Sequence, residues 1–484
     1  MTAAPDVDRS TLATACMPLT REHPGLSGIV PLREGYDAFA ARVLLAEAAE
    51  QTLDVQYYIW HNDLSGKLLF DALKRAADRG VRVRLLLDDN NTGGLDDTLS
   101  ALDAHERIEV RLFNPFHRRR ARWLDYLTDF SRLNRRMHNK SFTADNQVTI
   151  VGGRNIGDEY FGAGHDVMFV DLDVVAIGPV VAEVSRDFDR YWQSESAWPV
   201  ARVLPPATGE CVQTVADQLD HAAQSAEAVA FLEAVERQPL VRDLMEQSLA
   251  FEWAPTKMVS DDPAKGLGRA RDSELLWSRL KEIVGNPTTE LHLISPYFVP
   301  GRAGSRQIAS MAKRGVKVTI LTNSLEATDV TAVHAGYSKY RKRILRSGAI
   351  LFELKRTSPQ PRERRRAFRG RSGSSRSSLH AKTFAIDRAK MFVGSFNFDP
   401  RSARLNTELG FVIDSPTLAN GLATAFVERI PERSYKVRLR SNVGLKWTEL
   451  LDGREVAHER EPGAGAGLRL AVAVFGLLPI EWLL

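Results

Sequence analysis

The chain contains few cysteines and no apolar run long enough to cross a bilayer. Only Cys16 and Cys211 occur among 484 residues, so we expect neither a disulfide framework nor a thiolate metal site. Residues 470–480 come nearest to a membrane span, but they fall short of roughly 20 apolar residues, and Pro479 interrupts them. This segment fits an amphipathic position at a membrane surface or an ordinary terminal core helix.

The net charge is also small, at +4, and does not by itself indicate a polyanionic partner. The positive charge is unevenly spread, with basic runs at residues 118–136 and 355–376. A charge run is usually a solvated loop. Because each run precedes one copy of a repeated reactive pattern, we also consider a positive collar for an anionic substrate or surface.

The reactive pattern occurs twice, and the second copy follows the first by 242 positions. The recurring positions are His138, Lys140, Asp145, Gly152, Gly153 and Asn155 in the first copy, and His380, Lys382, Asp387, Gly394, Ser395 and Asn397 in the second. One acid recurs at the same offset, as Asp166 and Glu408. Such a register indicates a protein assembled from two similar halves.

Each half begins with the same predicted succession of strand, helix and strand. The segments are residues 52–60, 66–78 and 81–87 in the first half, and residues 291–298, 306–314 and 315–321 in the second. Units of this length favour parallel strands with helices on the sheet faces. In the reactive segments the period changes to two, which predicts that His138 and Lys140 share one face of a strand.

We therefore predict an α/β protein with two pseudo-symmetric domains, each a mixed sheet flanked by helices. The expected boundaries are a disordered tail (1–30), the first domain (31–198), a linker with accessory helices (199–265), the second domain (266–430) and a C-terminal region (431–484). Residues 355–378, rich in Arg, Ser, Gly and Pro, predict a mobile loop. If the halves meet face to face, two imidazoles and two ammonium groups converge.

These groups suit displacement at a phosphate diester. One histidine attacks to form a phosphohistidine, and the other protonates the leaving alcohol and later deprotonates the acceptor. Lys140, Lys382 and the two asparagines, Asn155 and Asn397, would hold the phosphoryl oxygens. Lysine is not a usual zinc ligand, so we expect no metal and no cofactor.

The remaining positions of the repeat have supporting roles in this hypothesis. Gly153 and Ser395 are placed beside the substrate, where the backbone comes close. Asp166 and Glu408 are predicted to accept the second N–H of each imidazole and fix its tautomer. Asp145 and Asp387 are grouped with the catalytic set, although their predicted turns favour support of the turn or the lysine over proton transfer.

The pattern His-x-Lys-(x)4-Asp-(x)6-Gly-Gly/Ser-x-Asn, present twice, resembles the phospholipase D superfamily. The resemblance spans roughly residues 30–430 and implies a pseudo-symmetric α/β sandwich, metal-free catalysis and one active site at the junction of the halves. It also implies that His138 is the nucleophile and His380 the acid and base. The residues themselves do not separate these two roles.

Residues 56–60, 111–116, 134–140 and 152–157 look like those of bacterial cardiolipin synthases of the C type, as do residues 327–337 and 479–484. This similarity implies transfer of a phosphatidyl group between phospholipids, with phosphatidylglycerol as acceptor and phosphatidylethanolamine or phosphatidylglycerol as donor. It further implies a peripheral protein at an anionic bacterial inner membrane.

Three alternatives stay open at this stage. A phospholipase D that releases phosphatidic acid uses the same residues, with water as acceptor. A nuclease of the superfamily would bind nucleic acid through the basic runs, although few aromatic residues lie among them. A non-catalytic lipid-binding scaffold is disfavoured because a scaffold needs no paired nucleophile and acid.

Overall fold

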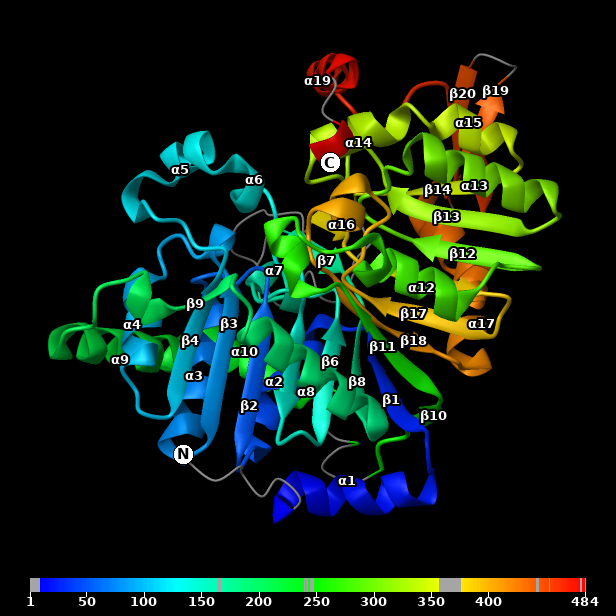
Figure 1. Cartoon of the computed structure of the whole chain (residues 1–484). Coiled ribbons are helices and arrows are strands. Elements are labelled where there is room, and N and C mark those ends of the chain that lie inside the picture. Colours follow the sequence, from blue (N-terminus) through cyan, green and yellow to red (C-terminus); the bar gives the residue numbers. More distant parts are fainter. Residues whose placement is uncertain are drawn as a thin grey trace.

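Two large mixed sheets, one in each half of the chain, form the framework of the computed structural model (Figure 1). The structure describes residues 9–163, 167–238, 240, 243, 248–356, 376–440, 444–451, 453–478 and 481–483. The predicted α/β class is confirmed. No helix among these residues is long and apolar enough to cross a membrane.

The first sheet has nine strands in the order β10-β1-β8-β6-β5-β2-β3-β4-β9. The central strands β2, β3 and β4 are parallel, and the outer ones are antiparallel. The strands are β1 (Ser27–Leu32), β2 (Thr52–Tyr57), β3 (Arg82–Asp88), β4 (Ile108–Phe113), β5 (Ser141–Ala144), β6 (Val148–Gly152), β8 (Asp173–Ile177), β9 (Ala197–Pro199) and β10 (Glu252–Ala254). The helices of this half are α2 (Gly35–Ala48), α3 (Leu64–Asp78), α4 (Asp96–Asp103), α5 (Arg122–Thr128), α6 (Phe130–Leu133), α7 (Asp158–Phe161) and α8 (Pro179–Trp192).

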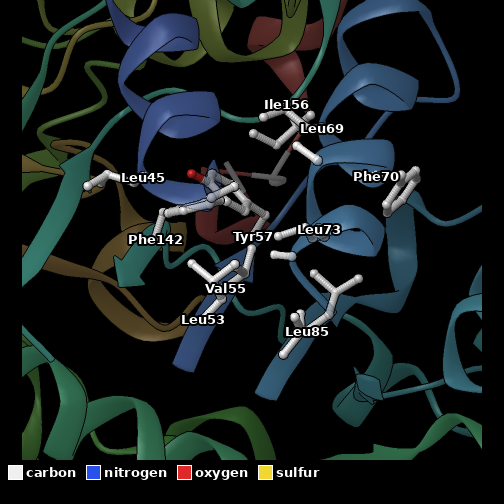
Figure 2. Packing of buried hydrophobic residues seen from close by; sticks show 14 of the residues in the cluster. Leu45, Leu53, Val55, Tyr57, Leu69, Phe70, Leu73, Leu85, Phe142 and Ile156 are labelled. Atoms are coloured by element: carbon white, nitrogen blue, oxygen red, sulfur yellow. The ribbon is translucent and has the colours of Figure 1, made fainter. Parts of the chain in front are cut away.

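Helices α2 and α3 cover the sheet because they bury an apolar face against it. Alternate residues of β2 (Leu53, Val55 and Tyr57) point toward Leu69 and Leu73 of α3 (Figure 2). All five side chains are essentially inaccessible to solvent. Burying one such side chain contributes about 1.5–3 kcal/mol, so this layer holds the first half of the site in place.

The second sheet repeats the arrangement, with the order β11-β18-β17-β16-β12-β13-β14-β19-β20-β21. Its strands are β11 (Thr256–Ser260), β12 (Glu290–Ile294), β13 (Lys317–Asn323), β14 (Ile350–Leu354), β16 (Thr383–Ile386), β17 (Lys390–Gly394), β18 (Leu409–Ile413), β19 (Ser434–Arg440), β20 (Gly444–Leu451) and β21 (Arg454–His458). Its helices are α12 (Leu276–Val284), α13 (Gly301–Lys313), α14 (Thr331–Ser338), α15 (Arg341–Arg346), α16 (Pro400–Arg404), α17 (Pro416–Glu428), α18 (Ile430–Arg433) and α19 (Ala466–Leu477).

The two halves share a core and are joined by strands. Buried residues of both sheets and of α8 form one cluster: Ile29, Val151, Val174, Ala176, Val180, Val184, Ala254, Met391, Val393, Leu409, Phe411 and Ile413. On either side of Pro255, β10 completes the first sheet and β11 completes the second. A separate parallel pair, β7 (Val167–Val170) and β15 (Arg376–Leu379), joins one segment from each half. The halves therefore form one packed unit.

Several expected boundaries differ from the structure. Residues 11–22 of the expected tail form α1 (Thr11–Glu22), because Ser10 caps the helix and Ala13 and Cys16 are buried. The second domain also continues past residue 430, since β19, β20 and β21 extend its sheet. Within the expected linker, α9 (Gly209–Gln224) and α10 (Ala226–Glu236) are the predicted accessory helices. Most of the predicted mobile loop, residues 357–375, lies outside the described residues.

Candidate active site

The two histidines lie where the halves touch, and each is tied to the opposite half through its backbone. Met137 forms a parallel bridge with Thr407, and the His138 N–H donates to the Thr407 carbonyl at 2.9 Å. In the second copy, β15 pairs with β7, and the His380 N–H donates to the Val170 carbonyl at 2.9 Å. The strand predicted to carry His138 and Lys140 begins only at Ser141, so both residues precede β5.

Each imidazole is bound by a carboxylate from the other half. His138 Nδ1 lies 2.8 Å from Glu408 Oε2, and His380 Nδ1 lies 2.5 Å from Asp171 Oδ2. All four residues are buried. The site is therefore cross-paired, an arrangement that the repeat alone does not reveal.

The carboxylate of the first half that binds a histidine belongs to Asp171, which the repeat between the two halves does not predict. Asp166, the residue predicted from the repeat, lies outside the described residues. Thr407 and Val170 accept equivalent backbone bonds, and each is followed directly by the carboxylate that binds the histidine. The first copy has five more residues between its histidine and this acid, which breaks the register of the repeat.

Gly153 and Ser395 give the two carboxylates different surroundings. A Cβ on Gly153 would stand 2.2 Å from Asp171 Oδ1, so only glycine lets this carboxylate come so close. Ser395 instead donates from its hydroxyl to Glu408 Oε2. Both residues are predicted beside the substrate, and the structure shows that each also contacts the carboxylate of its pair.

The lysines are buried beside their histidines. Lys140 Nζ donates to the His138 carbonyl and lies 5.4 Å from the centre of the Tyr58 ring. Lys382 Nζ donates to the His380 carbonyl. Burial lowers the pKa of both ammonium groups, and each lysine also lowers the pKa of the other histidine. The four groups therefore act as one electrostatic centre.

The pKa values of the two imidazoles are lowered to different extents. Burial and the charges of Lys140 and Lys382 hold the pKa of His138 well below its usual value. Burial and Lys382 also lower the pKa of His380, but Asp171 opposes them. The histidine paired with Asp171 therefore keeps a proton more readily.

The two carboxylates differ in the opposite sense. Burial raises the pKa of Glu408 to about 7, even though Lys140 and the hydroxyls of Ser395 and Ser402 favour its charged form. Burial also works against the charge of Asp171, but His380 and Lys382 outweigh it and lower the pKa of Asp171. Near neutral pH, Asp171 is thus ionised, whereas Glu408 is close to its midpoint.

Two asparagines of the repeat and the tyrosines near them lie around the two histidines. Asn155 accepts from the Ile59 N–H at 3.2 Å and donates to Tyr160 Oη at 3.0 Å. Asn397 Oδ1 is buried, and no partner for it was found in the described part of the chain. Tyr58 meets the His138 ring edge-on at 5.0 Å between centroids. No pattern in the sequence predicts these aromatic contacts.

Residues 44–192 and 280–430 match the family described as "Cardiolipin synthase, PLD-like domain". The two matched segments correspond to the two halves of the structure and contain both copies of the reactive pattern. The chain belongs to this phospholipase D-like family. The predictions of the family and of two such domains are confirmed.

Individual relatives agree with this assignment. Cardiolipin synthase C of Escherichia coli (strain K12) is 52% identical over 98% of this chain and 99% of that protein. Cardiolipin synthase A of Pseudomonas entomophila (strain L48) is 27% identical over 83% of this chain and 68% of that protein. In fold alone, the crystal structure of phosphatidylserine synthase from Haemophilus influenzae Rd KW20 matches with a TM-score of 0.61 at 13% identity, covering 98% of this chain and 100% of that chain.

The third residue of each family pattern, Asp145 or Asp387, lies in a turn and binds backbone. Asp145 accepts the N–H groups of Glu50, Gln51 and Thr52 at 2.8–3.0 Å. Asp387 makes the equivalent bonds at the start of β12. Both aspartates have positive φ, near 50°, as does the next residue in each turn. These contacts support the turn interpretation over a role in proton transfer.

Much of the first basic run of this phospholipase D-like chain is neutralised internally. Arg119 pairs with Asp89 and Asp96, and Arg136 pairs with Asp88 at 3.0 Å. The predicted collar is therefore weaker than the count of arginines indicates. The second run falls mostly outside the described residues.

One group in the described part of the chain has the composition of a metal site, namely His61, Asp63 and Glu159. Asp63 already accepts the N–H groups of Gly66 and Asp158, and His61 Nδ1 lies 3.3 Å from Glu159. These contacts account for the cluster as a cap and an ion pair. No metal is assigned to it.

Proposed function

We propose that this chain is a phosphatidyltransferase of the cardiolipin synthase type. It would move a phosphatidyl group from phosphatidylethanolamine or phosphatidylglycerol to the headgroup alcohol of another phosphatidylglycerol. The observation that carries the proposal is the cross-paired centre of two buried imidazoles, each bound to a carboxylate of the opposite half. The similarity to a protein named cardiolipin synthase C over nearly the whole chain supports the lipid class.

His138 is the proposed nucleophile. Free imidazole has a pKa near 6.5, and the lowered pKa of His138 keeps its ring neutral at physiological pH. When Nδ1–H donates to Glu408, the lone pair on Nε2 is available. Nε2 attacks the phosphorus of the donor lipid, and a P–N bond forms as the bond to the donor headgroup oxygen breaks.

His380 is the proposed proton carrier. Burial and Lys382 lower the pKa of His380 as well, but ionised Asp171 offsets part of this lowering by stabilising the imidazolium form. That form donates its proton to the departing headgroup oxygen. The neutral ring then takes the proton of a phosphatidylglycerol hydroxyl as that oxygen attacks phosphorus. The P–N bond breaks, and His138 returns to its starting state.

The lysines and the burial of the site favour transfer. Lys140 and Lys382 offset the charge on the phosphoryl oxygens. The side chains of His138 and His380 are only 7% and 6% exposed, so little bulk water reaches the intermediate. A sheltered centre favours an alcohol that binds over water that diffuses in.

The test uses purified full-length protein and vesicles of phosphatidylglycerol, with or without phosphatidylethanolamine carrying deuterated acyl chains. Lipid mass spectrometry should detect cardiolipin, and deuterium in one phosphatidyl unit would identify phosphatidylethanolamine as donor. Phosphatidic acid without cardiolipin would replace this proposal with hydrolysis. Cleavage of plasmid DNA without any lipid product would replace it with a nuclease.

Because the proposed substrates are bilayer lipids, we place the protein at the surface of the bacterial inner membrane as a peripheral protein. Fractionation of cells that express the chain, with a carbonate or high-salt wash, checks this placement. Release of the protein by the wash is expected.

A further inference from the structure

We propose that α5–α6 and α19 form a two-part docking surface for an anionic lipid bilayer, with one part in each half of the chain. This inference deepens the proposed function and rests on it for the choice of a lipid partner. Figure 1 shows α5–α6 at the upper left and α19 at the top of the molecule, with α7, α16 and β7, which carry or adjoin the site residues, below them.

The segment α5–α6 exposes apolar side chains and buries an acidic one, which is the reverse of an ordinary surface helix. Trp123, Leu127 and Phe130 are 66%, 74% and 44% exposed, whereas Asp125 on the same segment is 1% exposed. Asp125 is bound there by the backbone and guanidinium of Arg118 at 2.8 and 2.9 Å. A surface helix in water buries its apolar face, so these outward apolar side chains favour an apolar partner.

The segment α5–α6 is held firmly and lies close to the site. Arg119 and Arg122 of this segment bind Asp89, Thr92 and Asp96, which follow β3. Helix α6 ends at Leu133, five residues before His138. Partly buried ion pairs therefore anchor the segment that carries the exposed apolar side chains.

Helix α19 shows the same combination of exposure and anchoring. Leu470, Val474 and Leu477 are 66%, 51% and 87% exposed, and no residue of the helix is buried. The segment before it is fixed because Glu461 lies 2.7 Å from both His334 of α14 and Arg341 of α15. Helix α19 is too short to span a bilayer, but its length and composition suit a position in the interface.

Exposed cations around Tyr340, which follows the helix α14 that packs against α19, favour an anionic lipid surface over a neutral apolar partner. Arg302 and Arg343 are exposed and lie close enough to Tyr340 to affect its electrostatics. Tyr340 in turn donates to Glu481 at 2.6 Å, near the C-terminal end of the chain. Just before α5, Arg120 is exposed, and no ion pair of it occurs in the described part of the chain. Each such cation adds attraction to a negative membrane surface.

The test is sedimentation of the full chain with vesicles of phosphatidylcholine that contain or lack phosphatidylglycerol. The double variant Leu127→Ser and Leu477→Ser should bind phosphatidylglycerol vesicles at least about ten-fold more weakly than the wild type. Val427→Ser is the matched control, because Val427 is 66% exposed but lies on α17, away from α5–α6 and α19 (Figure 1). Unchanged melting temperatures would show that all variants fold.

The outcomes separate docking from catalysis. The double variant should keep its turnover of a short-chain phosphatidylglycerol supplied as monomers below its critical micelle concentration, and lose turnover on vesicles. If the wild type shows no lipid turnover but the variant still loses vesicle binding, docking stands and the proposed function falls. If the double variant binds vesicles as the wild type does, or changes only its oligomeric state, docking is overturned.

Discussion

The two halves of the active site hold the same residue types in different proton states. In one pair, Glu408 has a raised pKa and faces His138, whose pKa is lowered further than that of His380. Ser395 donates a hydrogen bond to Glu408. In the other, Asp171 with its lowered pKa faces His380, and Gly153 leaves room for the acid. Pseudo-symmetry of sequence thus produces chemical asymmetry, because the surroundings of each imidazole differ. This asymmetry supports the proposal that the first pair attacks and the second transfers protons.

The largest expected effect comes from removing either imidazole. His138→Ala and His380→Ala should each lower kcat on lipid substrates by about 10³-fold or more, because one loses the nucleophile and the other the acid and base. Rates of cardiolipin formation, with melting temperatures as a control, check this. Turnover within ten-fold of wild type in either variant would contradict the two-imidazole centre.

Replacing Gly153 with serine should break the Asp171 pair. The added Cβ would stand 2.2 Å from Asp171 Oδ1, so the carboxylate must move away from His380. We expect a loss of about 10²-fold in kcat. Ser395→Gly is the matched change in the other half, and it should cost less than ten-fold, because Ser402 still donates to Glu408. Equal losses in the two variants would contradict the comparison.

The carboxylates should separate by pH. Glu408→Gln resembles the protonated acid, so its cost should be small below pH 6 and should grow as the pH rises through about 7, where Glu408 ionises. Asp171→Asn should cost about 10²-fold at every pH from 5 to 8, because the lowered pKa keeps Asp171 ionised throughout. Profiles of kcat/KM against pH for the two variants measure this. Parallel profiles would show that the two pairs are equivalent.

Stability should respond with opposite signs in the same two variants. The folded pKa of Glu408, about 7, lies above its unfolded value, so the wild type loses stability as the pH rises between these two values. Glu408→Gln avoids this loss and should melt higher than the wild type, with the full difference reached above pH 7. The folded pKa of Asp171 lies below its unfolded value, so Asp171→Asn should melt lower at neutral pH. Thermal melts at pH 6 and pH 8 distinguish the two.

The smallest expected effect on catalysis comes from the aspartates in the turns. Asp145→Asn and Asp387→Asn should lower the free energy of unfolding by about 1–3 kcal/mol, through lost bonds to backbone N–H groups, and leave kcat within a few-fold. Burial opposes the charge of Asp387, but its bonds to Thr288, Thr289 and Glu290 lower its pKa. The stability cost of Asp387→Asn should therefore disappear as the pH falls below about 4. A large fall in kcat at unchanged stability would place these aspartates in the chemistry.

Much of the fold and half of the centre could be predicted from the sequence. Local periodicity indicated the strand-helix-strand units that became β2, α3, β3 and β12, α13, β13. The repeat indicated both histidines and both lysines because their spacing is set within one short segment. The turns at Asp145 and Asp387 could also be predicted from the local sequence.

The pairing of each histidine with a carboxylate of the opposite half could not be predicted from the sequence. It depends on contacts between segments about 270 residues apart, such as Met137 with Thr407. Counting from the repeat indicated Asp166 in place of Asp171, because the first copy has five more residues between its asparagine and this acid. The pKa differences depend on burial and on neighbours from the other half, which no local pattern contains.

The most direct test of the asymmetry is to locate the covalent phosphorus. A phosphatidyl ester of p-nitrophenol needs no acid for its leaving group, so His380→Ala should still be phosphorylated by it and should discharge slowly for want of a base. Rapid quenching at alkaline pH, digestion and peptide mass spectrometry should find the adduct on His138 in His380→Ala, and no adduct in His138→Ala. An adduct on His380 in His138→Ala, with none on His138 in the other variant, would contradict the account.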